Sequence, residues 1–349
     1  MDTDLPYMQR CLELARTGLG SVAPNPMVGA VVVHNGKIIG EGYHEGYGQA
    51  HAEVNAIKSV ADKSLLSESV LYVNLEPCDH FGKTPPCTAL ILEHHIPRVV
   101  IGTVDPFDAV AGKGISRLRN AGLDVKVGVL KNECNFLNRR FFTFHQHKRP
   151  YVILKWAQSH DGFIDKIRKP SDTVGPNWIT SPDLRMLVHK WRSEEQSIIV
   201  GANTALKDNP CLNVRDWTGK SPLRLLIDPK LIVNESSHLF DKSINTIVFN
   251  ETREMKSKNL EWVKLDFQKA VVPQVLDFLF TRGIQSMIVE GGRMVLDAFI
   301  GNGLWDEARV FIGDKYFEQG LEAPQIQSKG HENIHFGEEE LRIFYNNHY

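Results

Sequence analysis

The sequence has no long hydrophobic run, few cysteines and no large excess of charge of either sign. No stretch approaches the roughly 18 apolar residues that cross a bilayer. The acidic start MDTDLPYMQR lacks the basic and apolar regions of a signal peptide. Five cysteines in 349 residues are too sparse for a disulfide scaffold. These absences predict a soluble, cytoplasmic chain without a membrane partner, in which cysteines are core residues, metal ligands or nucleophiles.

The charges of the chain nearly balance, with 40 Lys and Arg against 42 Asp and Glu and a net charge of −2. This balance offers no general basic surface for nucleic acid. Hydrophobic residues make up 42% of the chain and charged residues 23%, which excludes a disordered tail and a collagen-like repeat. At roughly 150 residues per domain, the length predicts about two globular domains.

Helix and strand patterns alternate along the first part of the chain, which predicts an α/β layer architecture with a mostly covered sheet. A helix is expected over 5–16 and a hairpin over 27–43 that turns at Asn35-Gly36. The next helix, 51–61, is expected to bury Val54, Ile57 and Ala61. The remaining elements expected here are strands at 69–78 and 98–106, a helix at 87–96, and a helix, glycine stop and short strand over 114–130.

A domain boundary is expected where the basic, aromatic run 138–150 ends in proline and the strand YVILKWA begins. We therefore predict two different α/β domains, 1–147 and 148–349. Surface loops are expected at 166–177 and 250–260. The strands and helices expected in the second half are strands at 151–157, 197–202, 223–228, 246–250 and 286–292 and helices at 183–192 and 271–280.

In the first half, one imidazole and two thiols lie where predicted helices begin or a predicted strand ends. His51 opens a helix, Cys78 follows a strand and Cys87 opens the next helix. One His and two Cys suit zinc, and three protein ligands leave a fourth position for a water whose pKa zinc lowers. Glu53, two residues from His51, is placed to move protons without binding the metal.

Each of these residues alone is more often structural, because a helix-start His commonly caps or packs and a buried Cys behaves as a small hydrophobe. Together they match the zinc deaminase signature H-x-E…P-C-x-x-C, except that eight residues, not two, separate Cys78 from Cys87. The remaining cysteines, Cys11, Cys134 and Cys211, have no such context and are expected to be structural.

The segments APNPMVGAVVV, HAEVNAI and NLEPCDHFGKTPPC resemble the deaminase domain of the bifunctional deaminase/reductase family of riboflavin biosynthesis, which has this longer loop between its cysteines. The resemblance implies a cytidine-deaminase-like three-layer domain with Zn²⁺ held by His51, Cys78 and Cys87 and with Glu53 as proton shuttle. It also implies contacts to a pyrimidine ribose phosphate. Asn25 and His44 are the residues implied for the pyrimidine. His80, Lys83 and Thr84 suit the phosphate by their chemistry, an imidazole, a cation and a hydroxyl, and equally suit a solvated loop.

The second half lacks the G-x-G-x-x-G fingerprint. It has instead a strand, Glu290-Gly291-Gly292 and a helix pattern, and glycines at such a junction let backbone amides approach a phosphate. Blocks between 149 and 313, among them NWITSPDLRMLVHKWR and IIVGANTALKDNPCLNVR, resemble the reductase domain of the same family. The resemblance implies a dihydrofolate-reductase-like α/β domain that uses NADPH.

The resemblance implies two sets of contact residues in this domain. The cofactor contacts are Ala157, Trp178, Thr204, Asp208, Gly291 and Gly292. The substrate contacts are Lys155, Arg192, Leu212, Arg215 and Glu290. Guanidinium groups suit a ribose phosphate, whereas Lys155 and Glu290 are expected to pair beside the sugar carbon that receives hydride. Without the family resemblance, the arginines are equally well explained as surface ion pairs.

The function implied is deamination of a phosphoribosylated diaminopyrimidine followed by reduction of its ribosyl group, with small-molecule substrates as the partners. Two alternatives stay open. One is another nucleoside or tRNA deaminase fused to a reductase, although the 14 basic and 15 acidic residues of 1–147 disfavour tRNA. The other is a nucleotide-sensing module clipped by zinc, although structural zinc sites usually have four ligands. The sequence leaves open whether the chain forms a homo-oligomer.

Overall fold

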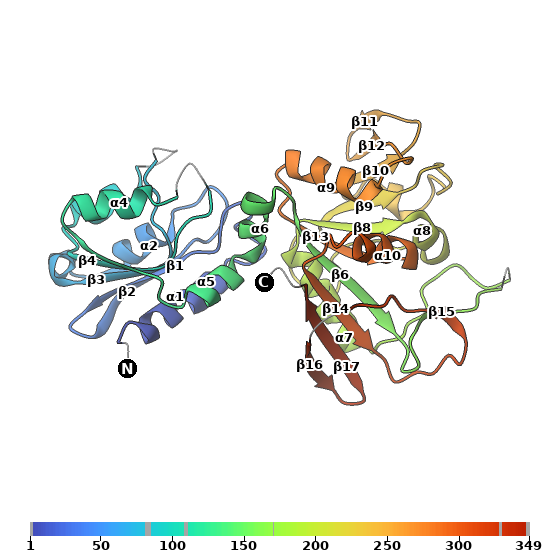
Figure 1. Ribbon diagram of the computed structural model, residues 1–349, viewed down its shortest axis with the longest axis horizontal. Coiled ribbons are helices and arrows are strands. Elements are labelled where there is room, and N and C mark those ends of the chain that lie inside the picture. Colours follow the sequence, from blue (N-terminus) through green and yellow to red (C-terminus); the bar gives the residue numbers. More distant parts are fainter. Residues whose placement is uncertain (1–2, 81–84, 108–110, 170, 328–329, 347–349) are drawn as a thin grey trace. The chain divides into compact units, whose positions relative to one another are not determined.

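The computed structural model describes residues 3–80, 85–107, 111–169, 171–327 and 330–346. The chain divides into two compact units, Met1–Lys148 and Arg149–Tyr349 (Figure 1). The boundary expected after residue 147 lies one residue from this division. None of the described helices is long and apolar enough to cross a bilayer.

The first unit contains one five-stranded sheet in the order β2-β1-β3-β4-β5. Its helices are α1 Leu5–Arg16, α2 Ala52–Ser59, η1 Lys63–Glu68, α3 Cys87–Glu93, α4 Lys113–Asn120, α5 Lys131–Leu137 and α6 Arg139–His147. Its strands are β1 Gly29–His34, β2 Lys37–Tyr43, β3 Val70–Leu75, β4 Arg98–Thr103 and β5 Asp124–Val127.

The sheet of the first unit is covered on both faces, which confirms the three-layer prediction. Apolar residues of α1 and α5 pack on one face, and those of α2, α3 and α4 on the other. The predicted hairpin is also confirmed: β1 and β2 pair antiparallel, and both turn residues have positive φ, 48° at Asn35 and 73° at Gly36. Two positive φ angles in a two-residue turn match the twist of the strands.

The predicted buried face of α2 is wrong at two positions, because Val54 is only half-buried and Ala61 is exposed. The helix instead buries small residues, among them Ala52 and Ala56. A Cβ atom at Gly42 of β2 would lie 2.3 Å from the Ala56 nitrogen, so helix and strand are in near-backbone contact. Small side chains, not the largest apolar ones, therefore form this contact. The sequence patterns also did not predict α5 and α6, the second of which lies in the basic, aromatic run.

The second unit contains a ten-stranded sheet in the order β11-β12-β10-β9-β8-β13-β6-β14-β17-β16 and a small sheet of β15 and β7. Its strands are β6 Tyr151–Gln158, β7 Phe163–Lys166, β8 Ser197–Gly201, β9 Leu223–Ile227, β10 Thr246–Asn250, β11 Met255–Ser257, β12 Leu260–Lys264, β13 Ser286–Gly291, β14 Glu307–Ile312, β15 Gly320–Glu322, β16 His331–Phe336 and β17 Glu339–Tyr345. Its helices are α7 Pro182–Glu194, α8 Ala202–Asp208, η2 His238–Phe240, α9 Val271–Thr281 and α10 Arg293–Gly301.

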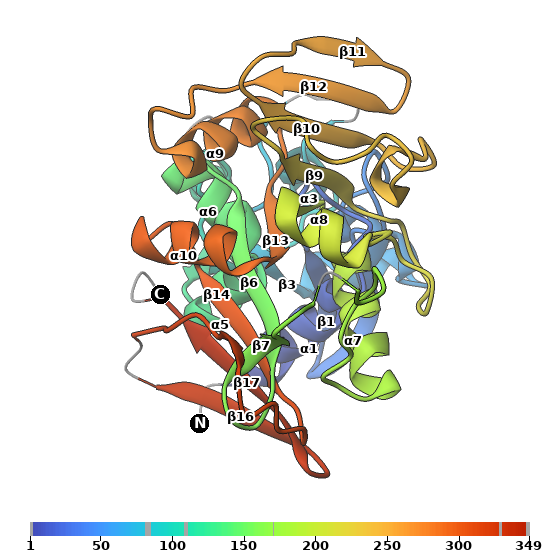
Figure 2. The same ribbon diagram turned by 90° about the vertical axis from the view of Figure 1, so that its right-hand side faces the viewer.

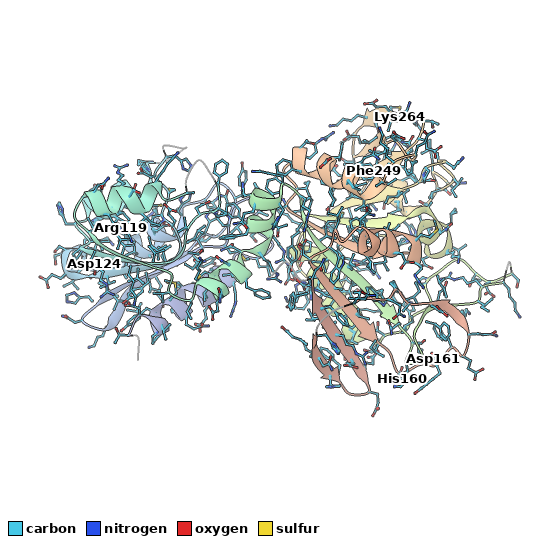
Figure 3. All side chains as sticks on the ribbon, in the orientation of Figure 1. Arg119, Asp124, His160, Asp161, Phe249 and Lys264 are labelled. Atoms are coloured by element: carbon cyan, nitrogen blue, oxygen red, sulfur yellow. The ribbon has the colours of Figure 1, made fainter. Side chains whose placement is uncertain are left out.

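The strands from β12 to β14 in the large sheet run parallel, and helices cover both faces (Figure 2). Residues of α9 and α10 pack on one face and those of α7 and α8 on the other. On the first face, for example, the ring of Phe249 in β10 lies edge-on to Phe278 of α9, with centroids 5.4 Å apart (Figure 3). The predicted α/β class is thereby confirmed for this unit.

The loop expected over 250–260 contains the exposed strand β11, so that prediction is wrong in part. The patterns also missed the strands after residue 320. All six residues of β16 are exposed, and four of them, His331, Glu332, Asn333 and His335, are polar, so the apolar alternation that predicts a half-buried strand is too short to detect.

Candidate metal centre and reductase site

Three elements of the first unit bring His51, Cys78 and Cys87 together. His51 is the residue before α2, Cys78 follows the end of β3 by three positions, and Cys87 begins α3. One ligand atom from each lies within 4.8 Å of the others. The imidazole Nδ1 lies 3.5 Å from Cys78 Sγ and 3.3 Å from Cys87 Sγ. The predicted ligand cluster is therefore present.

The protonation of the two thiols indicates that the cluster fits a divalent cation. A hydrogen bond from Cys87 lowers the pKa of Cys78 to about 4, whereas the same bond and burial raise the pKa of Cys87 well above its usual value. One sulfur is thus a thiolate only while the other keeps its proton. Zinc removes this conflict, because it binds both thiolates and neutral imidazole. Three ligands leave the fourth position open.

Glu53 lies on the first turn of α2 and is only 3% exposed. Burial raises the pKa of its carboxyl group, and nearby His51 opposes this rise only in part. A carboxyl group with a raised pKa next to a metal centre can accept and return a proton at neutral pH.

Asn25 and His44, both expected at the substrate, contact each other. The His44 ring donates from Nδ1 to the Ala50 carbonyl at 2.9 Å, so its Nε2 accepts from the Asn25 amide at 3.0 Å. The same ring lies edge-on to His51, with centroids 5.7 Å apart. The pair therefore borders the metal centre, and the hydrogen bonds fix which way the Asn25 amide points.

Of the three loop residues expected at the phosphate, His80 is exposed, and Lys83 and Thr84 lie outside the described residues. Asp105, which follows β4, was not among the predicted site residues. Burial, Glu76 and Cys78 raise its pKa to about 6, while His80 opposes the rise. The carboxyl group of Asp105 thus belongs to the same cluster of charges as the metal ligands.

Glu76, between β3 and Cys78, was also missed. It is 4% exposed, and each carboxylate oxygen accepts two backbone N–H groups. One oxygen accepts from Asp105 and Gly112 at 3.2 and 2.9 Å, and the other from Gly114 and Ile115 at 2.9 and 3.2 Å. This carboxylate therefore ties the segment after β4 and the start of α4 to the chain that leads into Cys78.

In the second unit, expected cofactor residues meet at the carboxyl ends of the parallel strands β8 and β13. The Gly292 amide donates to Thr204 Oγ1 at 2.8 Å. A Cβ atom at Gly292 would lie 2.8 Å from the same oxygen, so a larger residue does not fit there. Ligands of open parallel sheets bind outside these carboxyl ends, and the start of α10 beside the glycines suits an anionic group such as the NADPH diphosphate.

The other expected cofactor residues lie on different segments. Ala157 is on β6 and half-buried. Trp178 is 46% exposed, with the Arg185 guanidinium 4.2 Å above its ring. Asp208 ends α8 and accepts from Arg168 at 2.6 Å. Its carboxylate is therefore already paired within the protein.

Expected substrate residues form a buried charge cluster at the end of β13. Arg192 donates to both carboxylate oxygens of Glu290, at 2.9 and 2.7 Å. Burial opposes ionisation of Glu290, but Arg192 and Lys155 outweigh it and lower the pKa to about 2. Burial lowers the pKa of Lys155, and Glu290 counters this effect. The expected pairing is wrong in its partner, because Glu290 forms its ion pair with Arg192, and among the described residues no ion pair within 4.0 Å joins it to Lys155.

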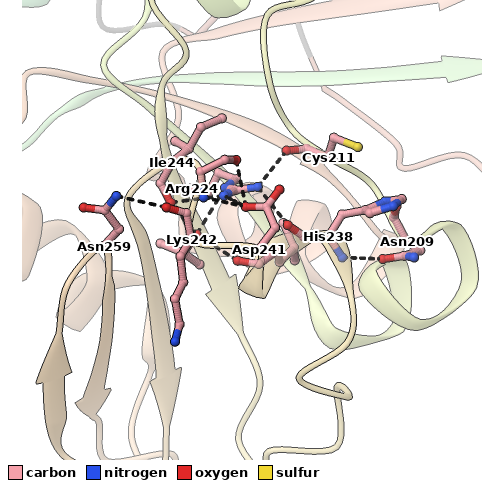
Figure 4. Close-up of polar contacts among 11 residues, drawn as sticks. Asn209, Cys211, Arg224, His238, Asp241, Lys242, Ile244 and Asn259 are labelled. Carbon is pink, nitrogen blue, oxygen red and sulfur yellow. Dashed lines mark hydrogen bonds and ion pairs between the residues drawn. The ribbon is translucent and has the colours of Figure 1, made fainter.

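Leu212 and Arg215 lie on the segment that follows α8. Arg224 holds the start of this segment. Arg224 is 0% exposed and lies on β9. Its guanidinium donates to the carbonyl of Cys211 at 3.2 Å and to the Asp241 carboxylate at 2.6 Å (Figure 4). Three further acceptors complete its hydrogen bonds, namely Thr246 Oγ1 and the carbonyls of His238 and Ile244. Leu212 is buried, whereas Arg215 is exposed.

Comparisons with known proteins match both units. Residues 1–103 match the model of the cytidine and deoxycytidylate deaminase zinc-binding region, and residues 150–333 match the RibD C-terminal domain. The riboflavin biosynthesis protein RibD of Aquifex aeolicus is 39% identical, over 99% of this chain and 98% of that protein. The corresponding protein of Bacillus amyloliquefaciens is also 39% identical, over 94% of this chain and 89% of its own.

The chain belongs to the RibD family. Solved structures agree along the full length. A diaminohydroxyphosphoribosylaminopyrimidine deaminase/5-amino-6-(5-phosphoribosylamino)uracil reductase of Thermotoga maritima is 38% identical, with a TM-score of 0.87 and 99% of each chain covered. RibD of Acinetobacter baumannii is 29% identical, with a TM-score of 0.86 and 98% of each chain covered.

As a RibD-family member, the protein is a bifunctional deaminase and reductase of riboflavin biosynthesis that uses Zn²⁺ and NADPH. The family match confirms the expected fold class, activities and cofactors, and the alternatives of a tRNA deaminase or a nucleotide sensor are not favoured. Its substrates are small pyrimidine compounds.

Proposed function

We propose that the first unit removes an amino group from 2,5-diamino-6-ribosylamino-4(3H)-pyrimidinone 5′-phosphate and that the second unit reduces the ribosyl group of the product to ribityl. In the first reaction, the oxygen of water bonds to the amino-bearing ring carbon, the C–N bond breaks and ammonia leaves. In the second, the bond between sugar C1′ and the sugar ring oxygen breaks, hydride from NADPH adds to C1′, which stays bonded to the exocyclic nitrogen, and a proton goes to the former ring oxygen, leaving NADP⁺.

His51, Cys78 and Cys87 would hold the zinc ion of the first reaction. When bound, zinc supplies a water molecule of lowered pKa at the open ligand position. Glu53 would take a proton from the attacking water and return one to the departing amine, a role that its raised pKa supports. Asn25 and His44 orient the pyrimidine ring, and His80, Lys83 and Thr84 contact the phosphate.

In the second reaction, Gly291, Gly292 and Thr204 would hold NADPH at the carboxyl edge of the sheet, with further contacts from Ala157, Trp178 and Asp208. Bound NADPH supplies the hydride. Lys155, whose pKa is lowered by burial, polarises the sugar beside the acceptor carbon. Arg215 binds the substrate phosphate, with Leu212 beside it. Arg192 and Glu290 fix the substrate side of the site through their ion pair.

One observation carries the deaminase assignment: a three-ligand His–Cys–Cys cluster lies beside a buried carboxyl group with a raised pKa. A structural zinc clip has four protein ligands and no use for a general base. The open position and Glu53 together therefore support catalysis.

The test uses the purified full-length protein loaded with zinc. We expect ammonia release from the diaminopyrimidine substrate without NADPH, and NADPH oxidation only once deaminated product has formed. NADPH oxidation on the diaminopyrimidine without ammonia release would contradict the proposed order. Ammonia release that is unchanged after full zinc removal would contradict the metal site.

A further inference from the structure

His189 lies on α7, is 3% exposed and belongs to none of the proposed contacts. The backbone N–H of Arg215 donates to its Nδ1 at 3.4 Å, and its Nε2 lies 3.2 Å from an Asp216 carboxylate oxygen. A backbone N–H can only donate, so Nδ1 must be the acceptor and Nε2 must carry the proton. Both contacts are therefore met only by the neutral Nε2–H form of the ring.

The segment held by His189 carries two proposed substrate contacts, Leu212 and Arg215. Arg224 holds the start of this segment through the Cys211 carbonyl at 3.2 Å, and Arg192 donates to the Asn213 carbonyl at 3.1 Å. At the other end of the segment, His189 accepts a hydrogen bond from the backbone N–H of Arg215. His189 thus bonds directly to the backbone of Arg215, the residue whose side chain is proposed to bind phosphate.

His189 also acts on the Arg215 guanidinium, through Asp216. The Asp216 carboxylate lies 3.2 Å from His189 Nε2 and 3.5 Å from Arg215 Nε. A second contact, at 3.2 Å, joins Arg215 Nη1 to the side-chain oxygen of Asn213. Beyond these contacts, Arg215, Asp216, Trp217 and Thr218 line an open surface hollow of about 460 Å³. The exposed guanidinium is therefore held at the edge of a space large enough for a ligand group.

The charges around His189 keep it in the form that these contacts need. Burial first, and then the cations Arg192 and Arg215, lower its pKa to about 4 against the opposing effect of Asp216 and Glu290. The ring is thus neutral at neutral pH, and Nδ1 stays available to accept.

We propose that His189 is a positioning residue for the reduction: it fixes the peptide of Arg215 and, through Asp216, the direction of the guanidinium that binds the substrate phosphate. The inference rests on the proposed role of Arg215. It assigns no proton transfer to His189.

Two near-isosteric variants separate the contacts of the ring. The amide of Asn in His189→Asn reaches the place of Nδ1 and can accept from the Arg215 peptide, whereas the amide of Gln in His189→Gln reaches the place of Nε2 and can donate to Asp216. His189→Leu removes both contacts. Loss of one hydrogen bond corresponds to roughly a two- to tenfold change in affinity. We expect the KM for the deaminated pyrimidine to rise by about that factor in the Asn and Gln variants and further in the Leu variant, with kcat and the KM for NADPH nearly unchanged.

His335→Gln on the exposed strand β16 is the matched control and should leave all three constants unchanged. On an Arg215→Ala background, His189→Asn should raise the substrate KM no further, because the residue acts through Arg215. If Arg215→Ala raises the substrate KM and the His189 variants do not, the inference is wrong. A parallel change of kcat and both KM values would make His189 a structural residue and would also overturn it. If Arg215→Ala itself has no effect on the substrate KM, the proposed phosphate contact fails instead.

Discussion

In the first unit, one ligand atom from each of His51, Cys78 and Cys87 lies within 4.8 Å of the others, and these residues come from a 37-residue stretch of the chain. In the second unit, the bonded pair Arg192 and Glu290 is separated by 98 positions. The first site depends on a few ligands that bind one ion. The second depends on many hydrogen bonds between distant segments. We therefore expect single changes to abolish deamination but to reduce the rate or affinity of reduction in steps.

The largest effect is expected from Cys87→Ser. A hydroxyl group is a poor replacement for a thiolate, so the zinc content should fall from about one ion per chain to well below it, and ammonia release should fall to background. Metal analysis and an ammonia assay measure both. NADPH oxidation on deaminated substrate, supplied separately, should stay at the level of the unchanged protein. Parallel loss of both activities would show that the sites are not independent.

Glu53→Gln should have the next largest effect. The variant keeps the size of the side chain but cannot take up a proton, so deamination should slow by roughly 10²–10⁴-fold. The zinc content should be unchanged, because Glu53 is not among the ligands, and metal analysis checks this. Loss of zinc together with activity would instead make Glu53 a ligand or a structural residue.

Glu76→Gln tests a carboxylate that binds no ligand. Its amide nitrogen would face two backbone N–H groups that now donate to an oxygen, and the unpaired groups should destabilise the first unit by about 1–3 kcal/mol. Urea unfolding of the zinc-loaded protein measures the change. Asp62→Asn, at an exposed carboxylate that also accepts a backbone N–H, is the control and should leave the unfolding midpoint unchanged. An unchanged midpoint in Glu76→Gln would mean that the amide contacts do not support the fold.

Arg215→Ala tests the stepwise behaviour expected of the second site. A charge-assisted contact is worth roughly 1.5–3 kcal/mol, and the half-exposed side chain favours the lower end of this range. The KM for the deaminated pyrimidine should therefore rise by about tenfold. Steady-state kinetics with both substrates measure it, and zinc content and deamination should not change. A fall in deamination would mean that one composite site serves both reactions.

The smallest effect is expected from Arg185→Ala, which removes the guanidinium 4.2 Å above the Trp178 ring. Cation–π contacts at exposed sites are worth about 0.5–1 kcal/mol, so the KM for NADPH should rise by roughly two- to fivefold if Trp178 contacts the cofactor. Met186→Ala, at the next position, which is exposed, serves as control. Equal KM values in both variants would remove Trp178 from the cofactor site.

The clustering of His51, Cys78 and Cys87 was predictable because each stands at the boundary of an element whose pattern is visible in the sequence. Glu76 was not, because its partners are backbone amides of residues 105–115 and no residue type marks them. The partner of Glu290 was misassigned for a topological reason: β13 lies between β6 and β8 in the sheet. Because β13 is placed between these two strands, its end lies near Arg192 of α7. Local sequence patterns do not predict the order of strands in a sheet.

The distribution of the five thiols has a practical consequence. All are free, and Cys11, Cys87 and Cys134 are buried. If Cys78 and Cys87 bind zinc as proposed, Cys211 is left as the partly exposed thiol of the chain. It lies beside Leu212 in the segment held by Arg224 and His189. A small fluorinated or spin label at this single position would therefore report on the substrate segment of the reductase in the full-length enzyme, without introducing a new cysteine. A chelator would add two reactive thiols, so the number of labels per chain would also measure zinc occupancy.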